Sequence, residues 1–82
     1  MEIPRRTLES LIAYRDHGVP PSGFVRACLE NKLCEAARRA DAENLAALTD
    51  IAAWLWNEMP VAYIGSAEAV NQHIIDKKTE YA

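Results

Sequence analysis

ADAENLAALTDIAAWLWNEMP, residues 40–60, is the stretch that decides the fold, because it predicts one continuous helix. At about 100° per residue, its apolar side chains form a stripe typical of a core-facing side. The stripe consists of Leu45, Leu48, Ala52, Leu55, Trp56 and Met59. Trp54 falls roughly opposite it, beside Asp50, Asn57 and Glu58. A small domain with one core has little reason to place a tryptophan among carboxylates. We therefore expect Trp54 to contact another element, another copy of the chain or a partner.

Three further helices are expected around this stretch. The first covers residues 4–17 and ends at Gly18, a residue suited to a left-handed helix end. The second, residues 23–40, begins after Ser22 as its N-cap, and the last begins after Gly65-Ser66. The core-facing residues expected in these helices are Leu8, Leu11, Ile12 and Arg15, then Val25, Cys28, Leu29, Leu33, Ala36, Ala37 and Ala40, then Val70, His73, Ile74 and Lys77.

Local signals refine the boundaries of these helices. Asn31 is a weak point at which the second helix can kink, and Asp41 suits the N-cap of the third. Residues 61–64 are too few for a sheet, so we expect them to cross the bundle and cover an edge of the core. The polar tail, residues 77–82, is expected to fray. The sequence thus predicts an all-α fold, a small compact bundle of three to four helices in one domain, residues 1–82.

Composition limits the class of protein. A chain of 82 residues, half of them apolar, can form one domain with a packed core of marginal stability, which self-association would support. Its first ten residues lack the apolar region of a secretory signal, and no apolar run is long enough to span a bilayer. The cysteines, Cys28 and Cys34, are separated by about 240° on one helix and cannot bridge within it. We therefore expect a cytoplasmic protein with free thiols and no membrane contact.

Charge and motifs argue against several activities. The net charge is −3, with most acidic residues in the second half, and an acidic balance disfavours general binding to a phosphate backbone. The candidate metal ligands or nucleophiles show neither C-x-x-C nor H-x-x-x-H spacing; they are His17, Cys28, Cys34 and His73. There is no glycine-rich phosphate loop. We therefore predict that the protein is not an enzyme and holds no metal and no cofactor.

Protein binding has the best local support, with self-association as a further expectation. Trp54 would be the anchor, and Asp50, Asn57 and Glu58 would supply a polar rim that meets a basic patch on the partner. Two other hypotheses remain open. Arginines from symmetric copies could converge on a small nucleotide, the candidates being Arg26, Arg38 and Arg39. A small helical DNA-binding protein is the third, although the acidic residues after the tight joint at Ala40-Asp41 would repel phosphates.

The sequence also resembles a group of short proteins encoded by phages and prophages. The matching residues span about 18–70 and are Val19-Pro20-Pro21, Gly23-Phe24, Leu29-Glu30-Asn31, Arg39-Ala40-Asp41, Glu43-Asn44, Trp54, Trp56, Asn57-Glu58, Pro60 and Gly65-Ser66. The resemblance implies a phage or prophage origin and no particular site residue. Small acidic phage accessory proteins bind a host protein, block a defence system as anti-CRISPR proteins do, or sequester a signalling molecule. The leading hypothesis is therefore stoichiometric binding of a host protein in the bacterial cytoplasm.

Overall fold

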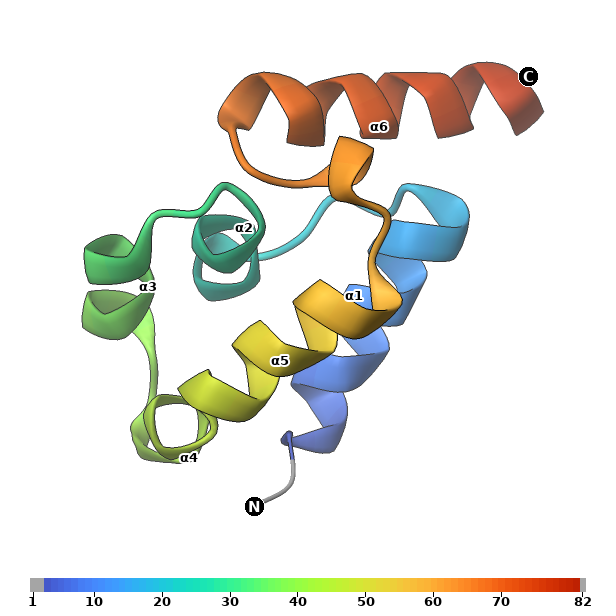
Figure 1. Ribbon diagram of the computed structural model, residues 1–82. Helices are drawn as coiled ribbons and strands as arrows, with labels where there is room; N and C mark the ends of the chain where they lie inside the picture. Colours follow the sequence, from blue (N-terminus) through green and yellow to red (C-terminus); the bar gives the residue numbers. More distant parts are fainter. Residues whose placement is uncertain (1–2, 82) are drawn as a thin grey trace.

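Short helices joined by tight turns make up the computed structural model, which describes residues 3–81, Tyr81 by its backbone alone (Figure 1). Within this range the elements are α1 (Arg5–His17), α2 (Gly23–Leu29), α3 (Leu33–Arg39), α4 (Ala42–Ala46), α5 (Leu48–Glu58), the 3-10 helix η1 (Val61–Tyr63) and α6 (Ala67–Tyr81). The predicted all-α class is confirmed for the described residues. The expected three to four helices are too few, because two of them are each broken once.

The first break lies at Asn31, between α2 and α3. Asn31 has a left-handed backbone with φ of 63°, which asparagine tolerates better than most residues. The Lys32 N–H donates to the carbonyl of Ala27 at 2.9 Å and closes the last turn of α2. The buried carboxylate of Glu30 accepts a hydrogen bond from Arg26 Nε at 2.7 Å and pairs with Lys32 Nζ at 3.0 Å. The predicted weak point at Asn31 is confirmed, as a full break rather than a kink.

The second break lies at Ala47, between α4 and α5. The backbone of Ala47, with φ of −94° and ψ of 4°, lies in the bridge region rather than in the α region. The single helix predicted for residues 40–60 is therefore wrong. The break at Ala47 interrupts the helical rotation between α4 and α5, so the apolar residues from Leu45 to Met59 do not form one continuous core-facing stripe.

The side of α5 that faces the core also differs from the prediction. The buried residues follow a four-residue spacing: Ala47, Ile51, Leu55 and Met59. Two expected core residues, Leu45 and Trp56, are 51% and 85% exposed, and Ala52 is exposed as well. The predicted stripe is confirmed for Leu55 and Met59, and wrong for Leu45, Ala52 and Trp56, because it left out Ile51. Once Ile51 and Leu55 both face the core, the period of 3.6 residues turns Ala52 and Trp56 to the outside.

The predicted helix ends are largely confirmed. Gly18 ends α1 with φ of 67°, and its N–H bonds back to the last turn. Asp41 caps α4, since its carboxylate accepts a hydrogen bond from the Asn44 N–H at 2.8 Å. Ser22 lies at the N-cap of α2 without a side-chain hydrogen bond. The Thr7 hydroxyl donates to the side chain of Asn44 and ties α1 to α4.

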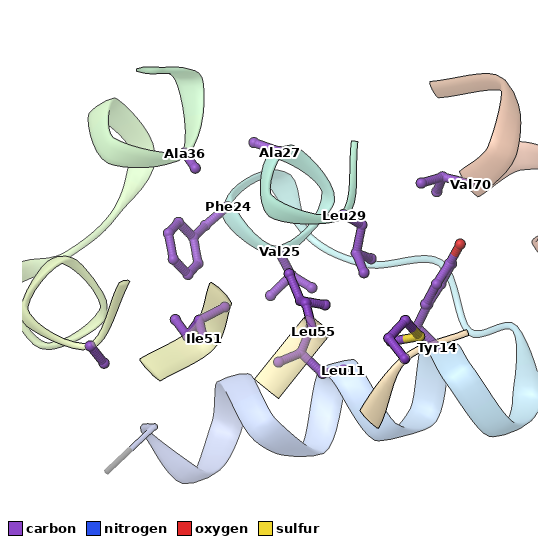
Figure 2. Close-up of a cluster of buried hydrophobic side chains, with 12 residues drawn as sticks. Leu11, Tyr14, Phe24, Val25, Ala27, Leu29, Ala36, Ile51, Leu55 and Val70 are labelled. Carbon is purple, nitrogen blue, oxygen red and sulfur yellow. The ribbon is translucent and has the colours of Figure 1, made fainter. Parts of the chain in front are cut away.

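Helix α2 lies at the centre of the core. Figure 2 shows Phe24 and Val25 of α2 reaching towards Ile51 and Leu55 of α5, with Leu11 of α1 below them. The core positions predicted in the first two helices are confirmed for Leu11, Val25, Leu29 and Ala36, which are all buried. They are wrong for Ile12 and Leu33, which are 36% and 67% exposed. Leu33 turns outward because the break at Asn31 resets the rotation of α3 relative to α2.

Helix α6 lies across the rest of the molecule and packs on η1 and α1 (Figure 1). Its expected inner side is confirmed, with Val70 and His73 buried and Ile74 and Lys77 half-buried. The His73 ring stacks on Tyr63 of η1 with 3.8 Å between the centroids. Its Nε2 bonds the backbone carbonyl of Tyr14 at 2.7 Å. These contacts fasten α6 to the core through η1.

The residues predicted to cross the bundle, 61–64, form η1 and the joint that follows it. The hydroxyl of buried Tyr14 donates to the carbonyl of Tyr63 at 2.6 Å, which holds this segment on α1. Burial raises the pKa of the Tyr14 hydroxyl to about 12. Helix α6 continues through the residues expected to fray, as far as Tyr81, and residue 82 lies outside the described residues.

Candidate binding groove

The two helix breaks leave an apolar groove between α5 and the joint of α2 and α3. Its volume is about 530 Å³. One wall comes from the start of α3, with Leu33 and Ala36, and the other from α5, with Leu48, Ala52 and Trp56. Val61 and Ile64 also line it, and the buried Leu29, Ile51 and Leu55 reach it from the core. We call this surface the Trp56 groove.

Three large apolar side chains at the groove face solvent. Trp56 is 85% exposed, Val61 82% and Leu33 67%. They come from three different elements, yet all line the same groove. Single exposed apolar residues are common in folded proteins, whereas a group of them around a hollow marks a site of interaction. The geometry therefore distinguishes this face from the scattered exposed residues elsewhere on the chain.

The groove offers almost no charge. Among its lining residues only Lys32 is charged, and its ammonium pairs with the Glu30 carboxylate at 3.0 Å. On α5, the exposed side around Trp56 consists of Thr49, Ala52 and Ala53. Asp50 and Glu58 lie more than about 100° away from Trp56 around the helix. Recognition at this face would rest on apolar contact and shape rather than on ion pairs.

The size of the groove suits a side-chain cluster or a small ligand. Ligand clefts commonly have volumes of about 300–1,000 Å³, with apolar walls and few polar groups. The groove is also partly open to solvent, so apolar side chains of another molecule can enter it. It can therefore bind apolar side chains of a protein, and its two reactive side chains are Cys28 and Lys32.

Trp54, the predicted anchor, packs within its own chain. It is half-buried against the core, and the guanidinium carbon of Arg15 lies 5.5 Å from the centroid of its ring. Arg15 also donates to the carbonyl of Glu58 at 3.2 Å and pairs with Asp16, whose pKa the hydrogen bond from Arg15 lowers. Of the three contacts expected for Trp54, with another element, another copy or a partner, the structure shows the first, because Arg15 of α1 packs on its ring.

The polar residues predicted beside Trp54 have different surroundings. Asn57 and Glu58 are exposed, and the Asn57 amide donates to the carbonyl of Ala53 at 2.9 Å. Asp50 is half-buried and has an interaction partner. Asn57 and Glu58 thus remain on the surface, but no exposed tryptophan lies among them, since Trp56 points to the groove.

The predicted nucleotide ligands fall into two separate ion-pair groups. Arg26 bonds to Glu30 and to the side chain of Asn71. Arg38 and Arg39 both bond to Glu35, at 2.9 and 2.7 Å. Hydrogen bonds from Arg39 and then Arg38 lower the pKa of the Glu35 carboxyl. Each of the three arginines therefore bonds to a carboxylate of its own chain, Glu30 for Arg26 and Glu35 for Arg38 and Arg39.

The described residues show neither an activated cysteine nucleophile nor a metal-binding cluster. Cys28 lines the groove, and burial raises the pKa of its thiol to about 11, so it is a neutral thiol rather than a nucleophile at pH 7. Both Cys28 and Cys34 are free. Within residues 3–81, no three His, Cys, Asp or Glu side chains gather as a metal ion would require. No helix in that range has both the length and the apolar character to cross a membrane.

Comparison of the chain with protein-family models, with curated proteins and with solved structures gives no match. The site is therefore interpreted from its own geometry. Sequence reasoning missed Trp56, Leu33 and Val61 as exposed residues. A signal was present in the four-residue spacing of Ala47, Ile51, Leu55 and Met59, which is one of two apolar stripes that the sequence allows and the one that turns Trp56 outward.

Proposed function

We propose that this protein acts by stoichiometric binding of another protein, with the Trp56 groove as its docking face. The observation that carries the proposal is a tryptophan with 85% of its surface exposed at the edge of an apolar groove of about 530 Å³. Tryptophan is among the residues that most often dominate binding energy at protein interfaces. Leaving such a side chain in water has no benefit for the fold of a single chain.

The resemblance to short phage and prophage proteins supports a host protein as the target. On this proposal the chain inhibits a bacterial defence or regulatory protein in the cytoplasm by covering a surface that the host protein needs. The partner would insert apolar side chains of a helix or loop into the groove, and Trp56 would pack over them. Occlusion of this kind needs no chemistry from the smaller protein, in agreement with a lining of apolar residues.

A pull-down from bacterial lysate tests the proposal. Tagged wild-type protein is compared with Trp56→Ala and with Glu58→Gln, which alters the acidic patch first predicted as the partner-binding surface. The captured protein is then purified and titrated with each variant by calorimetry. We expect one partner per chain, with binding about 30-fold weaker or worse for Trp56→Ala, as for a hot-spot residue, and unchanged for Glu58→Gln. Unchanged binding by Trp56→Ala would refute the groove as the docking face.

The nucleotide and DNA hypotheses give different outcomes in the same experiment. A nucleotide sponge would release a nucleotide from the eluate on heating and would depend on Arg26, Arg38 or Arg39 rather than Trp56. The melting temperature would then rise with a nucleotide, since a ligand that binds only the folded state stabilises it. DNA binding would weaken steeply with added salt. The ion pairs of these arginines favour neither alternative.

A further inference from the structure

We infer that, without a target, a second copy of this chain occupies the Trp56 groove, each copy inserting its Trp56 into the groove of the other about a twofold axis. The inference rests on the proposed function in one respect, since both use the same face. It differs in its consequence: the apolar face would be covered in the free protein, and a target would have to displace the second copy.

The first argument is shape. A twofold interface brings the same patch of both copies together, so the patch must carry both a projecting part and a matching hollow. The Trp56 groove meets this requirement within one chain. Trp56 and Val61 project into solvent, and the hollow between α3 and α5 lies directly beside them. A rotation that places one Trp56 over the other copy's groove also places the second Trp56 over the first groove, and the pair closes.

The second argument is charge. The chain carries a net charge of −3, so two copies repel each other over most orientations. At the groove this repulsion is reduced, because Lys32 is the only charged lining residue and it is paired with Glu30. The acidic side chains of α5 lie on its other side. The neutral face is therefore one on which this acidic protein can meet a second acidic protein identical to itself.

The third argument is area. A tryptophan presents roughly 200 Å² of surface, so an 85% exposed Trp56 offers about 170 Å². Leu33 and Val61 bring the exposed apolar area to roughly 300 Å² per copy. Two copies would therefore bury roughly 600 Å² through these three side chains, which is below the roughly 1,200 Å² at which stable specific interfaces begin. An area of this size is typical of a weak, transient contact that a target protein can replace, although buried area alone does not fix a dissociation constant.

Analytical ultracentrifugation of the untagged protein, from low micromolar to submillimolar concentration, tests the inference. Wild type is compared with Trp56→Ala and with Ile75→Ala, a matched control that removes an exposed apolar side chain from α6, which contributes nothing to the groove. We expect wild type and Ile75→Ala to approach the dimer mass as the concentration rises, and Trp56→Ala to remain a monomer. Circular dichroism of Trp56→Ala checks that the variant is folded.

The fluorescence of Trp56 provides a second, independent measurement of the contact between the two copies. In a Trp54→Phe background, Trp56 is the only tryptophan, and its emission should shift to shorter wavelength as the dimer forms and water leaves the ring. A wild-type protein that stays monomeric throughout, or a Trp56→Ala variant that dimerises equally well, would overturn the inference. A monomer that still captures a target through Trp56 would leave the proposed function standing. A Trp56-dependent dimer that captures no target would support this inference and contradict the proposed function.

Discussion

Replacing each of the two tryptophans by alanine should separate stability from binding. Trp54 is half-buried between the core and Arg15, so Trp54→Ala removes on the order of 100 Å² of buried apolar surface and one cation–π contact. At about 25 cal/mol per Å², the loss is about 2–3 kcal/mol. Trp56 is 85% exposed, which leaves roughly 30 Å² buried, so Trp56→Ala should cost less than about 1 kcal/mol. An 82-residue domain has a total stability of only about 4–12 kcal/mol, so the difference is large.

Urea and thermal unfolding provide the measurement, at submicromolar concentration so that association between copies does not contribute. For a domain of this size each kcal/mol shifts the melting temperature by about 4–8 °C, so Trp54→Ala should lose roughly 10–20 °C and Trp56→Ala less than about 8 °C. Trp54→Phe serves as a control that keeps an aromatic ring under Arg15. If Trp56→Ala were the more destabilised variant, the orientation assigned to α5, and with it the groove, would be wrong.

Three further predictions concern local structure. Gly18→Ala should lower the free energy of unfolding by about 2 kcal/mol or more, because the left-handed backbone disfavours a Cβ and that Cβ would lie 2.5 Å from a side-chain carbon of α6. Gly23→Ala is the control, since its Cβ would meet only the end of a flexible arginine side chain, and it should be near neutral in thermal unfolding. Asp41→Ala should lower the free energy of unfolding by about 1 kcal/mol in urea, because α4 loses its N-cap hydrogen bond. Ser22→Ala should lower it by less than about 0.5 kcal/mol, because the side chain of Ser22 makes no cap hydrogen bond. The pKa of the Tyr14 hydroxyl is raised from 10.0 to about 12 in the folded state, so its contribution to the free energy of unfolding is complete below pH 10 and is lost as the pH rises to 12. In urea titrations, the difference in free energy of unfolding between wild type and Tyr14→Phe should therefore narrow across that interval. A difference that stayed constant would contradict the raised pKa.

Local signals in the sequence predicted local structure well. Gly18, Asn31 and Asp41 each act through their own backbone or through a neighbour three or four residues away. Such effects need no knowledge of the rest of the chain. The all-α class follows from the same kind of evidence, because apolar periodicity and helix ends are encoded within each segment.

The orientation of α5 could not be fixed in this way. Apolar residues surround the helix, so two rotations leave a plausible apolar stripe. The core selects one of them, because Val25 of α2 packs among Ile51 and Leu55 (Figure 2) and Arg15 of α1 covers Trp54. These contacts join residues far apart in the sequence. The groove depends on the same choice and on the break at Asn31, which brings Leu33 opposite α5. The sequence therefore pointed to Trp54 as the more exposed tryptophan, whereas Trp56 is the one with 85% of its surface exposed.

Helix α4 links the two walls of the groove, yet none of its side chains is buried. It has five residues, the cap of Asp41 at its start and the hydrogen bond from Thr7 to Asn44. A segment with so few contacts opens at a free energy well below that of global unfolding. Local unfolding of α4 would lengthen the connection between α3 and α5 without exposing the core beneath α2. Local opening of α4 is therefore the motion expected to change the distance between the two walls of the groove.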